Sequence, residues 1–190
     1  MKTGIPYGDK TDYLEIPEKN FIGLLDPPEI FQAKNPAQVL LDAIENPIGG
    51  EKLEEIVKLG KKIVVIVDDG SRPTPVSLIL PVLMKKLQEC GAEKKDIKIV
   101  IALGSHRYMT EDEIKDRVGE EIYTSYQVLN SEFRDPKELV YICDSQEGAP
   151  LFATKSIMDA DIRIGVGNLV PHPVMGWGGG GKIIFPGVAG

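Results

Sequence analysis

Two runs of apolar, mostly β-branched residues stand out in the pattern of hydrophobic and polar positions. They are Lys62–Val67 and Lys98–Leu103, and neither run alternates with polar side chains after its first residue. Strands covered on both faces by helices lack such alternation, because both of their faces are buried. We therefore predict that both segments are buried strands of a parallel sheet.

Start and stop signals for helices surround these two runs. Asparagine or threonine followed by proline marks a helix start, because the side chain caps free N–H groups and proline fits the first turn. The pattern T-x-x-E is a capping box, in which two side chains satisfy two backbone donors reciprocally. The signals predict helices from Asn35-Pro36 to Asn46-Pro47, from Glu51 to Leu59, from Thr74-Pro75 to Gly91 with a kink at Pro81, and from Thr110-x-x-Glu113 onward.

Shorter segments complete the predicted fold. Residues 12–26 alternate around a Pro-Glu-Lys-Asn turn, which predicts a hairpin of two short strands. Residues 126–130, 138–143 and 161–167 are further strand candidates. Because strands and helices alternate, we predict an α/β fold. It is a Rossmann-like domain with a largely parallel sheet, helices on both faces and a small N-terminal strand hairpin.

The composition narrows the class of protein. The chain has 190 residues, of which 42% are hydrophobic and 27% charged, as expected of a single globular domain. A net charge of -7 without a Lys/Arg stripe argues against a nucleic-acid partner. No apolar run approaches the roughly 20 residues of a membrane span, and the polar N-terminus lacks the features of a signal peptide. Only two cysteines are present, Cys90 and Cys143, so we expect a cytoplasmic location.

Three loops that follow candidate strands carry most of the reactive side chains. They span residues 68–75, 104–107 and 167–173. In open parallel sheets, ligands bind outside the carboxyl ends of the strands. We expect these three loops to open on one edge of the sheet.

The two histidines of the chain, His106 and His172, lie in two of these loops. Imidazole transfers protons near neutral pH, and a racemase needs a base on one face of the stereocentre and an acid on the other. Two histidines from two strand ends can meet that need. The alternative is that either one is a loop histidine bonded to backbone, and the spacing alone does not decide.

The first loop combines an arginine with acidic and hydroxyl side chains. The planar guanidinium of Arg72 can bind a carboxylate through two hydrogen bonds. It can equally form a structural salt bridge with Asp68 or Asp69. Asp69 and Ser71 can cap the following helix or bind the hydroxyls of a nucleotide ribose.

A glycine-rich segment, residues 176–182, fits the opening G-x-x-x-x-G-K of a phosphate-binding loop. The Ser or Thr that should follow the lysine is absent, and residues 183–187 indicate a short strand or turn, not the α-helix of that motif. Consecutive glycines let the backbone approach a flat or phosphorylated ligand, and Lys182 stays free to act as a nucleophile or a point charge. We expect Lys182 to be exposed to a cleft and not paired within a helix. The apolar flanks argue against a plain glycine linker.

The segments DDGSRPTP, ALGSHR and GNLVPHPVMGWGGGGKIIFPGVAG, taken together, resemble the nickel-dependent lactate racemase family. The resemblance covers about Asp68 to Gly190. It implies a nickel pincer nucleotide covalently attached at Lys182 and racemisation or epimerisation of a small, lactate-like 2-hydroxy acid by reversible hydride transfer. It also implies site residues: His106 and His172 as catalytic groups, Arg72 for the substrate, and Asp69, Ser71, Gly179, Gly180, Gly181 and Lys182 for the cofactor.

The resemblance also implies limits and leaves alternatives. Residues 1–190 are expected to be the N-terminal domain that holds the cofactor and the catalytic histidines. The nickel-ligating histidine and a C-terminal domain are expected beyond the counterpart of Gly190, so no metal ligand is assigned here and the fragment alone should be inactive. The family's serine and alanine between the counterparts of Trp177 and Lys182 are replaced by glycine. A phosphotransfer enzyme that uses the Lys182 segment and a non-catalytic binding domain of the same fold remain as alternatives.

Overall fold

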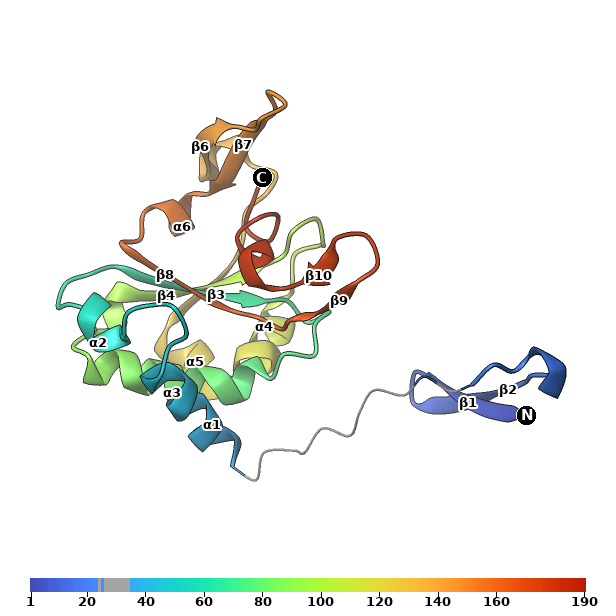
Figure 1. Cartoon of the computed structure of the whole chain (residues 1–190). Helices are drawn as coiled ribbons and strands as arrows, with labels where there is room; N and C mark the ends of the chain where they lie inside the picture. Colours follow the sequence, from blue (N-terminus) through green and yellow to red (C-terminus); the bar gives the residue numbers. More distant parts are fainter. Residues whose placement is uncertain (24, 26–34) are drawn as a thin grey trace. The chain divides into compact units, whose positions relative to one another are not determined.

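The computed structural model describes residues 1–23, 25 and 35–190. The chain forms two compact units, Met1–Lys34 and Asn35–Gly190, and the larger one contains the main sheet (Figure 1). Its helices are α1 (Pro36–Glu45), α2 (Leu53–Ile56), α3 (Val76–Glu89), α4 (Glu111–Val118), α5 (Glu120–Ser125) and α6 (Lys155–Met158). Its strands are β3 (Ile63–Asp68), β4 (Ile97–Ala102), β5 (Gln127–Asn130), β6 (Leu139–Asp144), β7 (Pro150–Thr154), β8 (Ile162–Val166), β9 (Val170–His172) and β10 (Gly176–Gly178). Short 3-10 turns are η2 (Lys94–Asp96), η3 (Pro136–Glu138) and η4 (Gly180–Ile183).

The N-terminal unit contains the predicted hairpin, but at an earlier position. Strands β1 (Lys2–Tyr7) and β2 (Lys10–Glu15) pair in antiparallel orientation, and the 3-10 turn η1 (Glu18–Asn20) follows. The predicted second strand at residues 21–26 is wrong for residues 21–23 and 25, which have no regular structure, and residues 24 and 26 lie outside the described residues. Gly4 and Pro6 hid β1 from a propensity argument, although an exposed edge strand tolerates proline.

The main sheet has four parallel strands in the order β5-β4-β3-β8. The chain moves from β3 to β4 to β5 in one direction and then returns to place β8 on the other side of β3. The strand order therefore reverses between β3 and β8. In Rossmann-like sheets this switch point forms the crevice in which ligands bind.

The two central strands are buried on both faces, as their apolar runs predicted. Ile63, Val65 and Val67 of β3 point into a core shared with α3, α4 and α5, whereas Val64 and Ile66 point into a second core on the opposite face. Each of these side chains is at most 1% exposed. Burial of an aliphatic side chain contributes about 1.5–3 kcal/mol, so the sheet is the main source of stability.

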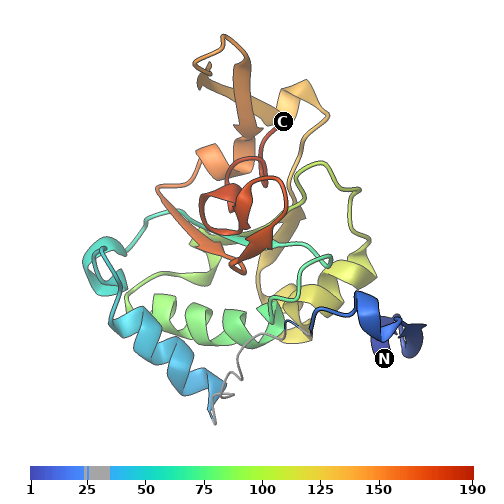
Figure 2. The same cartoon turned by 45° about the vertical axis from the view of Figure 1, so that its right-hand side comes forward.

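Figure 2 shows how different the coverings of the two faces are. The helices α3, α4 and α5 cover one face. The other face is covered by the short α6 and by the C-terminal segment, through Ile157, Ile183, Ile184 and Val188. Helices on both faces were predicted, and this is confirmed. That residues 183–188, directly after the glycine-rich segment, supply much of the second layer was not predicted.

The helix predictions were confirmed where the signals were local. Asn35 caps α1 through its side chain, and Thr110 forms the predicted capping box at α4. The helix expected at residues 51–59 shrinks to α2, because Val57 adopts extended backbone and buries its side chain in the core. Thr74 does not cap α3, since its hydroxyl donates to the Asp68 carboxylate instead.

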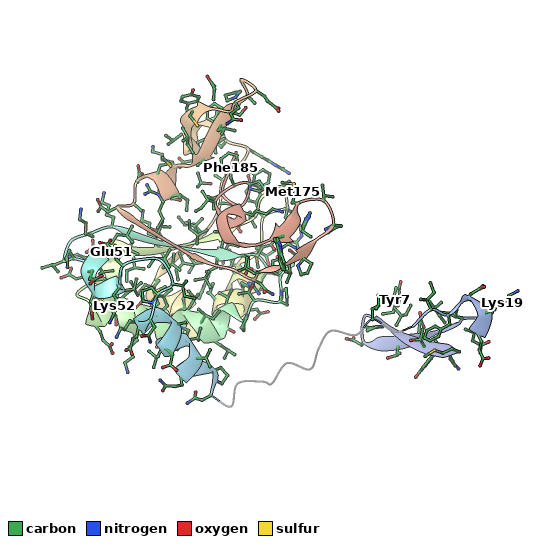
Figure 3. All side chains as sticks on the ribbon, viewed as in Figure 1. Tyr7, Lys19, Glu51, Lys52, Met175 and Phe185 are labelled. Atoms are coloured by element: carbon green, nitrogen blue, oxygen red, sulfur yellow. The ribbon has the colours of Figure 1, made fainter. Side chains whose placement is uncertain are left out.

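Two hairpins extend from the larger unit. β6 pairs with β7, and β9 pairs with β10. Figure 3 marks Met175 in the turn between β9 and β10, where its side chain is exposed. None of the helices in the described residues is long and apolar enough to cross a membrane.

Candidate active site

A cavity of about 220 Å³ lies at the switch point of the sheet. The loops after β3, β4 and β8 line it, together with β9, β10 and η4, so the three predicted loops do open on the same edge. The predicted site residues that line it are Asp69, Arg72, His106, His172, Gly179 and Lys182. Ser71 lines a neighbouring cavity of about 640 Å³ that shares Asp69 and His106 with the first. Gly180 and Gly181 are among the lining residues of neither cavity.

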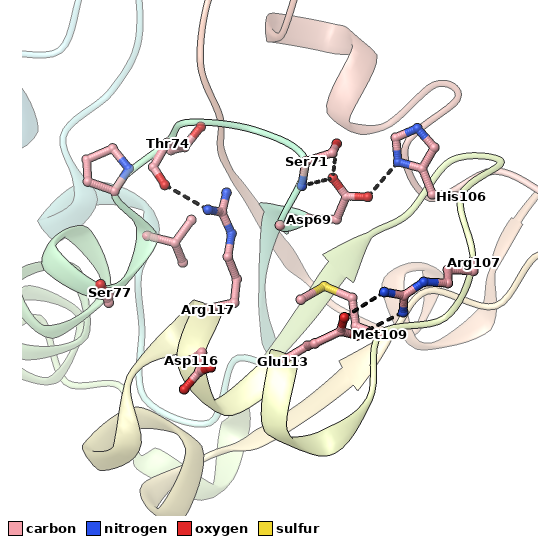
Figure 4. Close-up of a pocket in the computed structure, with 13 residues that line it drawn as sticks. Asp69, Ser71, Thr74, Ser77, His106, Arg107, Met109, Glu113, Asp116 and Arg117 are labelled. Carbon is pink, nitrogen blue, oxygen red and sulfur yellow. Dashed lines mark hydrogen bonds and ion pairs between the residues drawn. The ribbon is translucent and has the colours of Figure 1, made fainter. Parts of the chain in front are cut away.

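His106 is held by a carboxylate from the adjacent loop. Its Nδ1 lies 2.6 Å from Oδ2 of Asp69, and the contact is visible in Figure 4. The Asp69 side chain is 8% exposed and that of His106 is 48% exposed, so a buried anion orients an accessible imidazole. With Asp69 as the acceptor, the ring proton lies on Nδ1, and the lone pair of Nε2 is free to take a proton.

Asp69 is kept ionised despite its burial. Burial alone raises the pKa of its carboxyl, but hydrogen bonds from Ser71 and His106 outweigh this and lower the pKa below its ordinary value. Ser71 donates both its hydroxyl and its backbone N–H to Oδ1. Ser71 therefore acts on the site through Asp69, and it does not cap α3.

Nδ1 of His172 accepts hydrogen bonds, whereas Nδ1 of His106 donates one. The donors to Nδ1 of His172 are the backbone N–H groups of Val174, at 3.2 Å, and Met175, at 3.1 Å. An Nδ1 that accepts carries no proton, so the neutral ring has its proton on Nε2. The backbone contact that was the alternative reading for a loop histidine is present, but it involves only one of the two ring nitrogens. His106 thus offers an acceptor and His172 a donor at Nε2.

Arg72 does not form the structural salt bridge that the sequence left open. Asp68 is paired with Arg117 of α4, and Asp69 is paired with His106. Among the described residues the exposed Arg72 side chain has no ion-pair partner, and it lines the cavity. Its guanidinium is therefore available to an anionic ligand. Sequence reasoning missed Arg117 completely, because nothing local marks a helix residue that will reach a loop 49 positions earlier.

Lys182 lies in η4, a single 3-10 turn, and lines the cavity. No α-helix begins there, because turns follow directly over residues 184–188, so the expectation that Lys182 faces a cleft and is not paired within a helix holds for the described residues. The structural requirement of a phosphate-binding loop is therefore not met. The half-buried amine of Lys182 has no partner within the described part of the chain.

The glycines of this segment serve the fold of the segment itself. A Cβ on Gly179 would lie 2.0 Å from the carbonyl oxygen of Asn168, and Gly179 has a φ of +78°. Gly187 accepts the backbone N–H of Gly104 at 2.8 Å, which ties the segment to the loop that carries His106. Close approach of backbone to backbone thus requires glycine, at least at position 179.

A second anchor of the His106 loop comes from the last residue of β5 and from Glu132 just after this strand. The Tyr108 hydroxyl donates to Oε1 of Glu132 at 2.7 Å, and Asn130 exchanges two hydrogen bonds with the backbone of Met109. The same Glu132 oxygen accepts three backbone N–H groups. The loop is thus fixed on both sides of His106.

The described residues contain no group of three or more His, Cys, Asp or Glu side chains placed to hold a metal ion. The polar side chains that line the site end mainly in nitrogen and carboxylate groups. A proton acceptor and a proton donor share one crevice of a Rossmann-like sheet with a guanidinium and an amine that have no partner among the described residues. These features define the class: an α/β domain with a small-ligand site at the topological switch point.

Comparisons with known proteins place the chain within that class. The family model described as lactate racemase N-terminal domain matches residues 7–190. This chain belongs to that family. It is 30% identical over 187 residues to the lactate racemases of Lactiplantibacillus plantarum and of Thermoanaerobacterium thermosaccharolyticum, covering 97% of this chain and 44% of each relative. The chain therefore spans somewhat less than half the length of these relatives.

Solved structures agree with this assignment. The lactate racemase apoprotein of Thermoanaerobacterium thermosaccharolyticum superposes with a TM-score of 0.86 at 31% identity, over 100% of this chain and 44% of that chain. A protein of Thermotoga maritima superposes with a TM-score of 0.64 at 25% identity, over 80% of this chain and 38% of that chain. The fold is thus shared along the whole described chain.

Proposed function

We propose that this chain carries the catalytic histidines and the cofactor lysine of an enzyme that racemises or epimerises a small, lactate-like 2-hydroxy acid. The observation that supports it most is the pair His106 and His172, which line one cavity from two strand ends and present opposite protonation states at Nε2. A cofactor-independent binding domain has no need of such a pair. The names of the relatives favour racemisation among the reactions that two such groups can serve.

The size of the cavity favours a small substrate. Pockets for drug-sized ligands measure about 300–1,000 Å³, so a cavity of about 220 Å³ suits a smaller molecule. The guanidinium of Arg72, which lines this cavity, can serve as a bidentate partner for the carboxylate of such an acid. With the carboxylate bound to Arg72, the 2-hydroxyl group is the polar group of the substrate that remains to contact the imidazole rings of His106 and His172.

The residues present fit a nickel pincer nucleotide as the cofactor. Lys182 supplies a half-buried amine without a partner among the described residues, which suits a covalent attachment. The neighbouring cavity, which shares Asp69 and His106, gives a nucleotide room beside the small acid. Ser71 there and Gly179 at the first cavity are the other residues placed to contact it. When bound, the cofactor supplies a reversible acceptor for the hydrogen on C2 of the substrate, which avoids a carbanion.

The chain's own residues move the proton of the hydroxyl group. His106, with Nδ1 bound to Asp69, accepts the hydroxyl proton at Nε2 as C2 is oxidised. When C2 is reduced again from the other face, the carbonyl oxygen takes a proton from Nε2 of His172, and transfer of the proton held by His106 through solvent to Nε2 of His172 restores both rings to their starting protonation states. The reaction from the opposite enantiomer runs through the same steps in reverse order. Arg72 holds the carboxylate throughout, so the planar keto acid stays in the site.

The test is the intact mass of the complete protein after production together with the enzymes that make the cofactor. We expect a nucleotide-sized adduct on the wild type and racemisation of both enantiomers of lactate. Lys182→Arg should lose the adduct. Lys98→Arg, which changes an exposed lysine near the start of β4, should keep it. A wild-type protein without the adduct, or with the adduct and without activity on any small 2-hydroxy acid, would refute the proposal.

A further inference from the structure

The loop after β3 is held by one arginine from a distant helix. Arg117, on α4, has a side chain that is only 11% exposed. Its Nε donates to the carbonyl oxygen of Asp68 at 3.0 Å, and its Nη1 donates to the carbonyl oxygens of Arg72, at 3.1 Å, and Thr74, at 3.0 Å. Its Nη2 binds the Asp68 carboxylate. One guanidinium therefore contacts the start, the middle and the end of this loop.

Asp68 and Thr74 complete the cluster. The Asp68 side chain is 14% exposed, and its second carboxylate oxygen accepts the hydroxyl of Thr74. Figure 4 shows Arg117 reaching Thr74 beneath the loop that carries Asp69 and Ser71. Hydrogen bonds to charged groups are the strong ones, and this geometry uses the planar fork of arginine, which lysine cannot reproduce.

The loop held in this way carries the groups that face the site. Asp69 orients His106, and the backbone N–H of Arg72 donates to the carbonyl oxygen of Asp69 at 3.2 Å. The side chain of Arg72 lines the cavity, and the carbonyl oxygen of the same residue accepts a hydrogen bond from Arg117. A displacement of the loop would therefore move the oriented histidine and the free guanidinium together.

We propose that Arg117 is a positioning residue of the active site. It fixes Arg72, and it fixes Asp69, which in turn orients His106. Arg117 also lines the larger of the two cavities, but no step of the proposed mechanism uses its side chain, and its four hydrogen-bonded contacts are with the loop. The inference rests on the proposed function for its kinetic consequences. Its structural consequences for His106 stand independently.

The kinetic test is Arg117→Lys in the complete protein loaded with cofactor. Misplacement of catalytic groups by about 1 Å costs on the order of 10²-fold in rate, so kcat/KM should fall by about 10- to 100-fold. KM should rise because Arg72 moves, and kcat should fall because His106 loses its orientation. Arg163→Lys is the matched control, since Arg163 is exposed, makes one backbone hydrogen bond and lies near the start of β8. It should leave both constants unchanged.

Two readouts separate positioning from mere stability. In Arg117→Ala, added guanidinium ions should restore part of the lost kcat/KM. The ¹⁵N shifts of the His106 ring, assigned by comparison with His106→Gln, should show the Nδ1–H form in the wild type and a mixture of forms in Arg117→Lys. Thr74→Val removes only one hydrogen bond of the cluster, and it replaces the arginine variants as the test if those do not fold. Its His106 ring shifts should move away from the wild-type values toward the same mixture of forms, by a smaller amount than is expected for Arg117→Lys.

The proposal is overturned if Arg117→Lys lowers the thermal midpoint but leaves kcat/KM of the folded protein and the His106 ring shifts as in the wild type. Unchanged ring shifts in a folded Thr74→Val would count against it in the same way. If the wild type itself does not racemise, the proposed function fails, whereas the ring-shift test of Arg117 still gives an answer.

Discussion

Glu132 helps to anchor the loop that carries His106, and its pKa lies below the ordinary value. The Tyr108 hydroxyl and the backbone N–H groups of residues 133–135 donate to one of its oxygens. The hydrogen bond from Tyr108 is the largest cause, and the pKa of Glu132 falls from an ordinary 4.5 to about 2. The charged carboxylate therefore holds the loop that precedes α4 over almost the whole acid range.

This lowered pKa predicts a pH-dependent stability. Because the pKa is lower in the folded state, the contribution of Glu132 is complete above about pH 4.5 and is lost as the pH falls through about 2. Glu132→Gln should cost about 1–3 kcal/mol of unfolding free energy near neutral pH, because a neutral amide accepts these hydrogen bonds more weakly. The gap from the wild type should close between pH 4.5 and 2.

Denaturant unfolding at a series of pH values measures this gap. Glu147→Gln is the control, because Glu147 is exposed and its side chain forms none of the hydrogen bonds found among the described residues. Its unfolding free energy should follow that of the wild type. A gap for Glu132→Gln that stays constant down to pH 2 would show that the charge is not what stabilises the loop.

At the scale of elements, the glycine-rich segment is built by close backbone contacts. Gly179 combines a positive φ with a Cβ position 2.0 Å from the Asn168 carbonyl oxygen, whereas a Cβ on Gly181 would meet open space. Gly179→Ala should therefore destabilise the protein by about 1–3 kcal/mol and displace Lys182, because strained backbone of this kind costs that much. Gly181→Ala should be close to neutral.

Thermal unfolding and the yield of the Lys182 adduct measure the two variants side by side. The structure predicts a lower thermal midpoint and a lower yield for Gly179→Ala only. If Gly181→Ala is equally damaging, the segment contacts the ligand at that glycine, as the sequence suggested, and our account of the glycines is wrong.

The sequence predicted elements well wherever the signals lie within one turn. The caps at Asn35 and Thr110 are local hydrogen bonds between neighbours, and both were found as predicted. Val57 and Thr74 behave otherwise because each answers to a distant partner, the core in one case and the Asp68 carboxylate in the other. Local propensity cannot show such contacts, so these helix boundaries were misplaced.

At the scale of the whole molecule, strand order decides which loops meet. The apolar runs indicated a parallel sheet. Because the carboxyl ends of parallel strands meet at one edge, the sequence also predicted that the three loops lie together there. The order β5-β4-β3-β8, and with it the switch point, follows from long-range pairing that no spacing reveals. For the same reason the partners of Asp68 and Asp69 were left open, and Arg117 was missed.

The measurement that tests the central claim most directly is the racemisation rate of His106→Ala and His172→Ala in the complete, cofactor-loaded protein, starting from each enantiomer in turn. General acid–base groups contribute about 10²–10⁴ in rate, so each variant should lose activity by that order in both directions. The Lys182 adduct should remain in both. Near-normal racemisation in either variant, from either enantiomer, would contradict the two-histidine site.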